Sequence, residues 1–248
     1  LAFWIMRRYP PQWSKAGATG VGGPVIPILW LKIAAVGFGV LLLLIFPFFP
    51  DAPWDFIDHL RNSADVENYR VGSFWAYNFW GIWDFFKADS TEYQGLTYQI
   101  WGLVLFASTT LAVLYTLRNA EGDWALALGT ALCLMAFYVF LTRMHERYLF
   151  PFFMPFLAAC VLSRNPVLWG VFIVLGITQF LNLYQVYAYY QPNELRISDI
   201  YKYFEKPELL GSGWKLQQIL SFITFLAFPI TIVTTYLLAN PLKRSGAA

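Results

Sequence analysis

Long apolar runs constrain the fold of this 248-residue chain more than any other feature of its sequence. A helix needs about 20 mostly apolar residues to cross the hydrocarbon core of a membrane. Five runs are predicted spans on this basis: Pro24–Phe49, Leu96–Leu117, Trp124–Thr142, Val167–Ala188 and Leu216–Ala239. A sixth run, Tyr148–Ser163, is short and contains Pro151 and Pro155, so we expect it to be tilted, kinked or partly re-entrant.

Composition supports the same class of protein. Hydrophobic residues make up 58% of the chain and charged residues only 13%, whereas a soluble domain carries roughly 25% charge. A soluble enzyme, a disordered protein and a nucleic-acid binder are therefore excluded, and the net charge of +2 is too small to imply a polyanionic partner. The sequence predicts an all-α, polytopic bundle that forms a single transmembrane domain over residues 1–248.

The first residues predict the end of a further span. Residues 1–6 are apolar and are followed by Arg7 and Arg8, whereas a signal peptide places its charge before its apolar core. We therefore expect about six spans plus the end of a seventh, and we expect the chain to be the C-terminal portion of a longer protein.

The connections between the runs fall into two sets that predict the orientation. One set is short and basic: 7–23, 118–123, 163–166 and the tail from Asn240. The other set is longer and holds most of the acidic residues: 50–95, 143–147 and 189–215. Short basic loops stay in the cytoplasm. The sequence thus predicts an integral, multi-pass membrane protein with its C-terminus in the cytoplasm.

The two long outer segments are rich in aromatic residues. Residues 50–95 include four tryptophans, and residues 189–215 alternate aromatic with charged side chains. Aromatic side chains this dense at a membrane boundary form an interfacial belt or an amphipathic helix that lies among the headgroups. We expect both segments to be ordered at the membrane surface.

The strongest candidate for chemistry is the run from Thr142 to Pro151. Arg143, His145, Glu146 and Arg147 bring four ionisable groups to the outer end of a predicted span, and such groups are functional candidates by default. The two arginines share a face whether the segment is helical or extended. Paired guanidinium groups match phosphate oxygens, and Glu146 is expected to orient one arginine or to fix the tautomer of His145.

A purely structural interpretation of the same residues also stands. Arginines at a membrane boundary extend their side chains toward the headgroups, and a local ion pair can hold a turn in place. From the chemistry alone the two interpretations are evenly balanced.

Two motifs resemble those of a known enzyme class. The string His-Glu-Arg-Tyr-Leu-Phe-Pro at 145–151 follows an apolar run and resembles the late motif of bacterial GT-C glycosyltransferases. These polytopic, mannosyltransferase-like enzymes take a sugar from a polyprenyl-phosphate carrier, and related eukaryotic glucosyltransferases have a similar His-Glu-Lys motif. The string Trp-Ala-Tyr-Asn-Phe-Trp at 75–80 is similar to the Asn-x-Trp element of the bacterial proteins. The resemblance covers roughly residues 70–165.

The resemblance implies roles for particular residues. His145 and Arg147 are expected to contact the carrier phosphate, with help from Arg143, because cations aimed at the developing charge of the leaving group lower the barrier. Asn78 and Trp80 either border the entry of the sugar or lipid or, as the favoured alternative, belong to an aromatic belt. The family's catalytic carboxylate lies in the first outer loop, which we expect upstream of this chain.

The resemblance therefore implies the lipid-phosphate-binding part of a membrane glycosyltransferase that lies in the bacterial plasma membrane and acts on the extracytoplasmic side. Its expected partners are a polyprenyl-phosphate sugar donor and membrane lipids, with other membrane subunits as a further option and no nucleic acid. No cofactor is expected within this chain, and the need for a divalent metal stays open. The alternative is a non-catalytic accessory or scaffold subunit of a larger membrane complex, and a flippase or transporter of lipid-linked substrates is a weaker third.

Overall fold

The computed structural model describes residues 25–47, 49, 52, 54–64, 70–118, 120, 122–209 and 211–240. The chain divides into two compact units, Leu1–Glu67 and Asn68–Ala248. The predicted end of a span at 1–6, the arginines that follow it and the chain after Asn240 lie outside the described residues.

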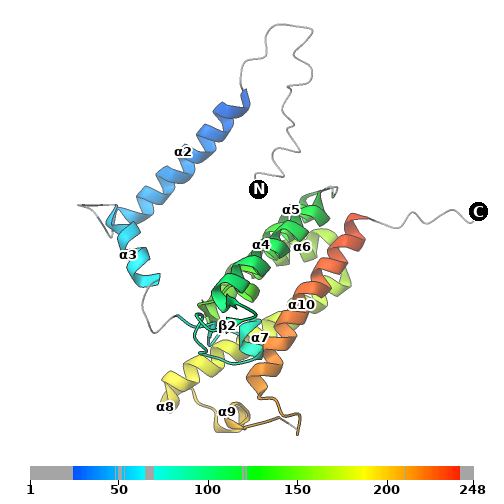
Figure 1. The fold of residues 1–248 in the computed structure, drawn as a ribbon. Helices are drawn as coiled ribbons and strands as arrows, with labels where there is room; N and C mark the ends of the chain where they lie inside the picture. The colour runs from blue at the N-terminus through cyan, green and yellow to red at the C-terminus, as the bar shows by residue number, and fades with distance from the viewer. Residues whose placement is uncertain are drawn as a thin grey trace, which may run out of the picture. The chain divides into compact units, whose positions relative to one another are not determined.

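The described part of the first unit consists of two helices (Figure 1). Helix α2 (Val25–Ile45) is an apolar helix of 21 residues inside the predicted span at Pro24–Phe49. Helix α3 (Asp55–Ala64) has Asp55 and Asp58 in its first turn, where negative charge interacts favourably with the helix dipole.

The second unit is a helical membrane bundle. Among the described residues, four helices are long and apolar enough to cross a membrane: α4 (Tyr98–Leu117), α5 (Asp123–Phe140), α7 (Pro166–Tyr190) and α10 (Leu216–Ala239). These are fewer than the six spans predicted. Helix α6 (Phe150–Ser163) has 14 residues, or about 21 Å at 1.5 Å per residue, which is shorter than the hydrocarbon core.

Local sequence signals set the ends of these helices. The Thr97 hydroxyl accepts a hydrogen bond from the amide of Ile100 and caps α4. The Asn165 side chain accepts from the amide of Val167 at 2.9 Å and caps α7, whose first residue is Pro166. A polar cap followed by proline is a strong start signal, because the proline nitrogen needs no partner there.

The core of the bundle lies around α5. Its side chains Leu128, Leu132 and Met135 are fully buried, and they belong to the same apolar cluster as Phe152 and Phe156 of α6. The rings of Phe152 and Phe156 stack with their centroids 4.5 Å apart. The other helices expose many large apolar side chains on their outer faces, among them Leu111, Met154, Phe180 and Val233. Apolar exposure on this scale fits a lipid environment rather than water.

Successive helices run in alternating directions, which sorts the connections between them. The connections at 118–122 and 163–165 lie at the end of the bundle where α10 finishes, and 70–97, 141–149 and 191–215 lie at the opposite end (Figure 1). The two sets of loops predicted for this unit are therefore at opposite ends. We call the second end, which carries residues 70–97, 141–149 and 191–215, the long-loop end.

The long-loop end has more structure than the all-α prediction included. Strand β1 (Ser73–Phe74) pairs in parallel with β4 (Met144–His145), and β2 (Glu92–Tyr93) pairs in antiparallel with β3 (Leu96–Thr97). Two short 3-10 helices, η3 (Trp80–Ile82) and η4 (Glu146–Leu149), lie there too.

The predicted second outer loop contains helices α8 (Pro192–Leu195) and α9 (Ser198–Glu205). Helix α9 is amphipathic: Tyr201 and Phe204 are buried in a small apolar cluster with Tyr77 and Leu220, while its charged side chains are exposed. By contrast, the aromatic residues at 74–86 lie in short extended and 3-10 segments instead of one amphipathic helix.

Candidate functional site

The turn after α5 brings the predicted site residues to the long-loop end. The backbone at Arg143 is left-handed, with φ of 62°, and its amide donates to the carbonyl of Val71 at 2.8 Å. His145 then lies in β4 and Glu146 begins η4. The segment is thus neither helical nor extended throughout, and the face predicted to be shared by Arg143 and Arg147 does not form in either way.

Arg143 is bound within the protein. Its Nε donates to Oδ2 of Asp89 at 2.7 Å, and the side chains of Arg143 and Asp89 are 27% and 5% exposed. The backbone of Asp89 is held by hydrogen bonds to Arg70 and Gln99. This geometry braces the turn against the loop before α4, so Arg143 has a positioning role in the fold.

Glu146 is the buried centre of the remaining cluster. Its Oε1 accepts from a terminal nitrogen of Arg147 at 3.1 Å, and its Oε2 lies 3.9 Å from Nδ1 of His145. Its backbone carbonyl accepts from the Gln179 side chain of α7 at 2.6 Å. The Arg147 side chain is 55% exposed. A buried carboxylate therefore orients a solvent-accessible guanidinium group.

His145 lies between aromatic rings next to that pair. Its ring centroid is 4.8 Å from that of Phe74 and 5.2 Å from that of Tyr148. Burial, followed by the positive charge of Arg147, lowers the pKa of His145 below its ordinary value of 6.5, and Glu146 only partly opposes this. The imidazole is therefore neutral at pH 7, with one nitrogen able to donate a hydrogen bond and the other able to accept one.

Backbone strain concentrates around this histidine. Trp75, Phe86 and Arg143 have φ between 60° and 65°, a region that costs an ordinary residue about 1–2 kcal/mol. The rings of Trp75 and Phe86 meet edge to face at 4.9 Å, and Trp75 also forms a backbone bridge with His145. Strain of this kind persists where the surroundings enforce it and clusters at functional sites.

Asn78 and Trp80 are buried, Trp80 as the first residue of η3 and Asn78 two residues before it. Nε1 of Trp80 donates to the carbonyl of Phe140 at 2.7 Å, and its ring stacks on that of Tyr98 with the centroids 4.8 Å apart. The Asn78 oxygen accepts from the amide of Gly81, while its buried amide nitrogen has no hydrogen-bond partner among the residues that the structure describes. Trp80 therefore fixes η3 against the end of α5 and Asn78 holds the amide of Gly81 within it, and neither bond reaches the charged turn.

Helix α7 carries a buried stripe of polar residues that contacts the backbone of the site. The sequence analysis missed this stripe. Thr178, Gln179, Asn182 and Gln185 are buried on one side of this apolar helix. The Asn182 side chain donates to the carbonyl of Trp75 at 2.5 Å and accepts from the hydroxyl of Tyr138. Polar residues at helical spacing within an apolar run are the signal that could have revealed this stripe.

In comparisons with known proteins, no family model, curated protein or solved structure matches this chain. The fold defines the class of protein as a helical membrane protein. The strained turn with Glu146, His145 and Arg147 is its candidate functional site.

Proposed function

We propose that this chain is the lipid-phosphate-binding part of a glycosyltransferase in the bacterial plasma membrane. The enzyme transfers a sugar from a polyprenyl-phosphate carrier to an acceptor hydroxyl on the extracytoplasmic side. The observation that carries the proposal is the accessible guanidinium of Arg147, which the buried Glu146 orients next to the neutral His145. This group lies at one end of the membrane-spanning helices, where a lipid phosphate is found.

The chemistry of these two residues suits a phosphate leaving group. A guanidinium group has five N–H donors, and the hydrogen bond to Glu146 uses one of them. The neutral imidazole of His145 lies next to Glu146 and adds no second buried charge to the site. Arg143, which Asp89 holds, positions the turn in this proposal instead of contacting the phosphate.

The proposed reaction is a direct displacement at the sugar. The acceptor oxygen forms a bond to the anomeric carbon, the bond from that carbon to the carrier phosphate breaks, and the polyprenyl phosphate leaves with the electron pair. The acceptor proton passes to a carboxylate base in an outer loop of the enzyme. Arg147 and His145 stabilise the negative charge that grows on the phosphate.

One observation favours a second candidate function. Arg143 and Arg147 each have a carboxylate partner within the chain, as expected where charges serve the fold alone. The second candidate is therefore an accessory subunit of a membrane complex that keeps the bundle as a scaffold.

The experiment measures sugar transfer from a polyprenyl-phosphate donor by the full-length protein in liposomes. We expect Arg147→Gln to lower kcat by about 10²-fold or more, His145→Gln to lower it less, and Arg147→Lys to recover part of the loss. The matched control is Arg196→Gln, which removes another arginine that pairs with a glutamate, Glu205, at the same end of the bundle. Unchanged transfer by Arg147→Gln defeats the proposal. Absence of transfer by the wild type, together with stoichiometric co-purification of other membrane subunits, supports the scaffold.

A further inference from the structure

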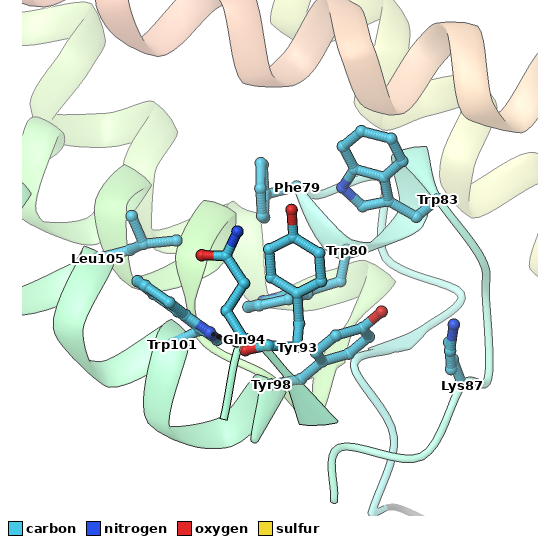
Figure 2. Close-up of a pocket in the computed structure, with 9 residues that line it drawn as sticks. All are labelled: Phe79, Trp80, Trp83, Lys87, Tyr93, Gln94, Tyr98, Trp101 and Leu105. Atoms are coloured by element: carbon cyan, nitrogen blue, oxygen red, sulfur yellow. Dashed lines mark hydrogen bonds between the residues drawn. The ribbon is translucent and has the colours of Figure 1, made fainter. Parts of the chain in front are cut away.

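A cavity of about 530 Å³ lies at the start of α4 (Figure 2), and no residue of the charged turn at 143–147 lines it. Its walls come from η3 and the segment after it, from the β2–β3 hairpin and from the first two turns of α4. The lining residues are Phe79, Trp80, Trp83, Lys87, Tyr93, Gln94, Tyr98, Trp101 and Leu105. This volume falls within the range of about 300–1,000 Å³ that is typical of small-molecule sites.

The walls of this cavity are ordered by contacts of their own. Trp80 stacks on Tyr98 and is bonded through Nε1 to the end of α5. Nε1 of Trp101 donates to the carbonyl of Tyr93 at 2.9 Å, which ties the hairpin to α4. Trp83 and Tyr93 are exposed, so the cavity opens to the surroundings of the protein. A preformed cavity of this kind needs little rearrangement to accept a ligand.

The lining specifies the chemistry of the ligand. Six of the nine residues are aromatic and one is leucine, so an apolar chain fits the walls better than a nucleotide or another polar molecule. Lys87 is the one charged residue among the nine, and none of them is acidic. Its Nζ lies 5.6 Å from the centre of the Tyr98 ring, at the edge of the cavity. An apolar chain attached to an anionic group matches this arrangement.

The position of the cavity indicates where such a ligand comes from. Helix α4 is one of the four apolar helices that can cross a membrane, and the cavity is lined by its first turns. Tryptophan and tyrosine gather at the level of the lipid headgroups, and a lysine at that level attracts anionic lipids. The membrane itself therefore supplies a molecule with both required parts.

We propose that this cavity binds an anionic phospholipid, with one acyl chain between the aromatic walls and the phosphate at Lys87. The acyl chain of the lipid gains close packing against Trp80, Trp101 and Leu105. Neither His145 nor Arg147 lines the cavity, so this site is separate from the one proposed for the sugar carrier and does not depend on it.

Native mass spectrometry of the full-length protein in a neutral detergent tests this proposal, with phosphatidylglycerol and phosphatidylcholine as the added lipids. We expect the wild type to bind phosphatidylglycerol more tightly, by roughly fivefold for one lysine next to a headgroup of net negative charge, because the choline of phosphatidylcholine cancels the charge of its phosphate. Lys87→Gln should remove that preference and Lys87→Arg should keep it. Leu105→Trp should fill the cavity and weaken the binding of both lipids.

The control is Lys202→Gln, because Nζ of Lys202 also lies 5.6 Å from a tyrosine ring, that of Tyr203, but outside the cavity. It should leave the preference unchanged. Equal binding of the two lipids by the wild type overturns the proposal. It is also overturned if Lys87→Gln and Lys202→Gln change the preference for phosphatidylglycerol to the same extent. Polyprenyl phosphate is the third ligand. If it binds more tightly than phosphatidylglycerol and depends on both Lys87 and Leu105, the occupant proposed here is wrong.

Discussion

The guanidinium Nε of Arg143 donates to Oδ2 of Asp89 at 2.7 Å, across 54 residues of sequence. The ion pair joins the turn after α5 to the loop before α4, and these two segments carry the candidate site and the aromatic cavity. Because the carboxylate of Asp89 is almost fully buried, water does not replace the arginine if it is lost. The pair is therefore the main charged link between the two segments among the ion pairs that the structure describes.

The first prediction concerns this ion pair. Asp89→Asn should lower the free energy of unfolding by about 1–3 kcal/mol, because it removes the carboxylate that accepts from Nε of Arg143. The matched control is Asp199→Asn in α9, which removes the partner of Lys202 from an exposed pair whose aspartate is 92% accessible. That change should cost no more than about 0.5 kcal/mol. Denaturant unfolding in detergent measures both, and equal losses contradict a special role for Asp89.

The second prediction concerns the left-handed backbone at Arg143. Arg143→Ala and Arg143→Gly both remove the ion pair, but only glycine adopts φ of 62° without strain. The glycine variant should therefore be more stable than the alanine variant by about 1 kcal/mol. At Arg196, where φ is −79°, the order should reverse by about 0.5 kcal/mol, because there glycine only adds freedom to the unfolded chain. The same order at both positions contradicts the assigned backbone geometry.

Much of the bundle follows from the sequence. Apolar length predicts α4, α5, α7 and α10 to within a few residues, because lipid forces each span to satisfy its own backbone. Helix α6 is continuous through Pro155, with Pro151 in its first turn, where proline is tolerated. Among the described residues fewer helices can cross a membrane than were predicted, and the run Tyr148–Ser163, already expected to be short, forms a helix of only 14 residues.

The site was predicted less completely, for a physical reason. Local spacing brings out residues 143–147 as a cluster, but it holds no information about Asp89 or Asn182, which are distant in sequence and meet the site only in the fold. The sequence therefore favoured two arginines on one face. In the structure the backbone at Arg143 is left-handed, and the two arginines pair with different carboxylates, Arg143 with Asp89 and Arg147 with Glu146. Left-handed backbone at a non-glycine residue depends on tertiary contacts and has no clear sequence signal.

The third prediction concerns the polar stripe of α7. Asn182→Leu should destabilise the protein by about 2 kcal/mol, because it leaves the partly buried carbonyl of Trp75 and the buried hydroxyl of Tyr138 without this partner. Asn193→Leu in the exposed helix α8 is the control and should change the free energy of unfolding by less than about 0.5 kcal/mol. If the two leucine variants unfold alike in detergent, the stripe does not support the site.

The fourth prediction is a pH dependence at His145. Its pKa is lower in the folded protein than the ordinary 6.5, so the unfolded chain binds more protons in the interval between the two values. Stability from this residue is therefore present above pH 6.5 and is lost as the pH falls toward the folded pKa. His145→Gln should flatten the fall in unfolding free energy below pH 6.5, relative to His59→Gln, which changes the chain's other histidine. Parallel pH profiles for the two variants contradict the prediction.

The fifth prediction tests the two ends of the bundle and the side on which the site is proposed to act. Ser212 lies at the long-loop end and Asn240 follows α10 at the other end, and both are exposed. In a background in which Cys133 and Cys160 are replaced by alanine, a membrane-impermeant maleimide should label Ser212→Cys in intact cells. It should label Asn240→Cys only after the membrane is permeabilised, because the short loops beside that end carry Arg118 and Arg164 and are predicted to lie in the cytoplasm. Labelling of both positions in intact cells contradicts the alternating helix directions. The reverse pattern keeps the bundle but places Arg147 in the cytoplasm, and transfer on the extracytoplasmic side is then wrong.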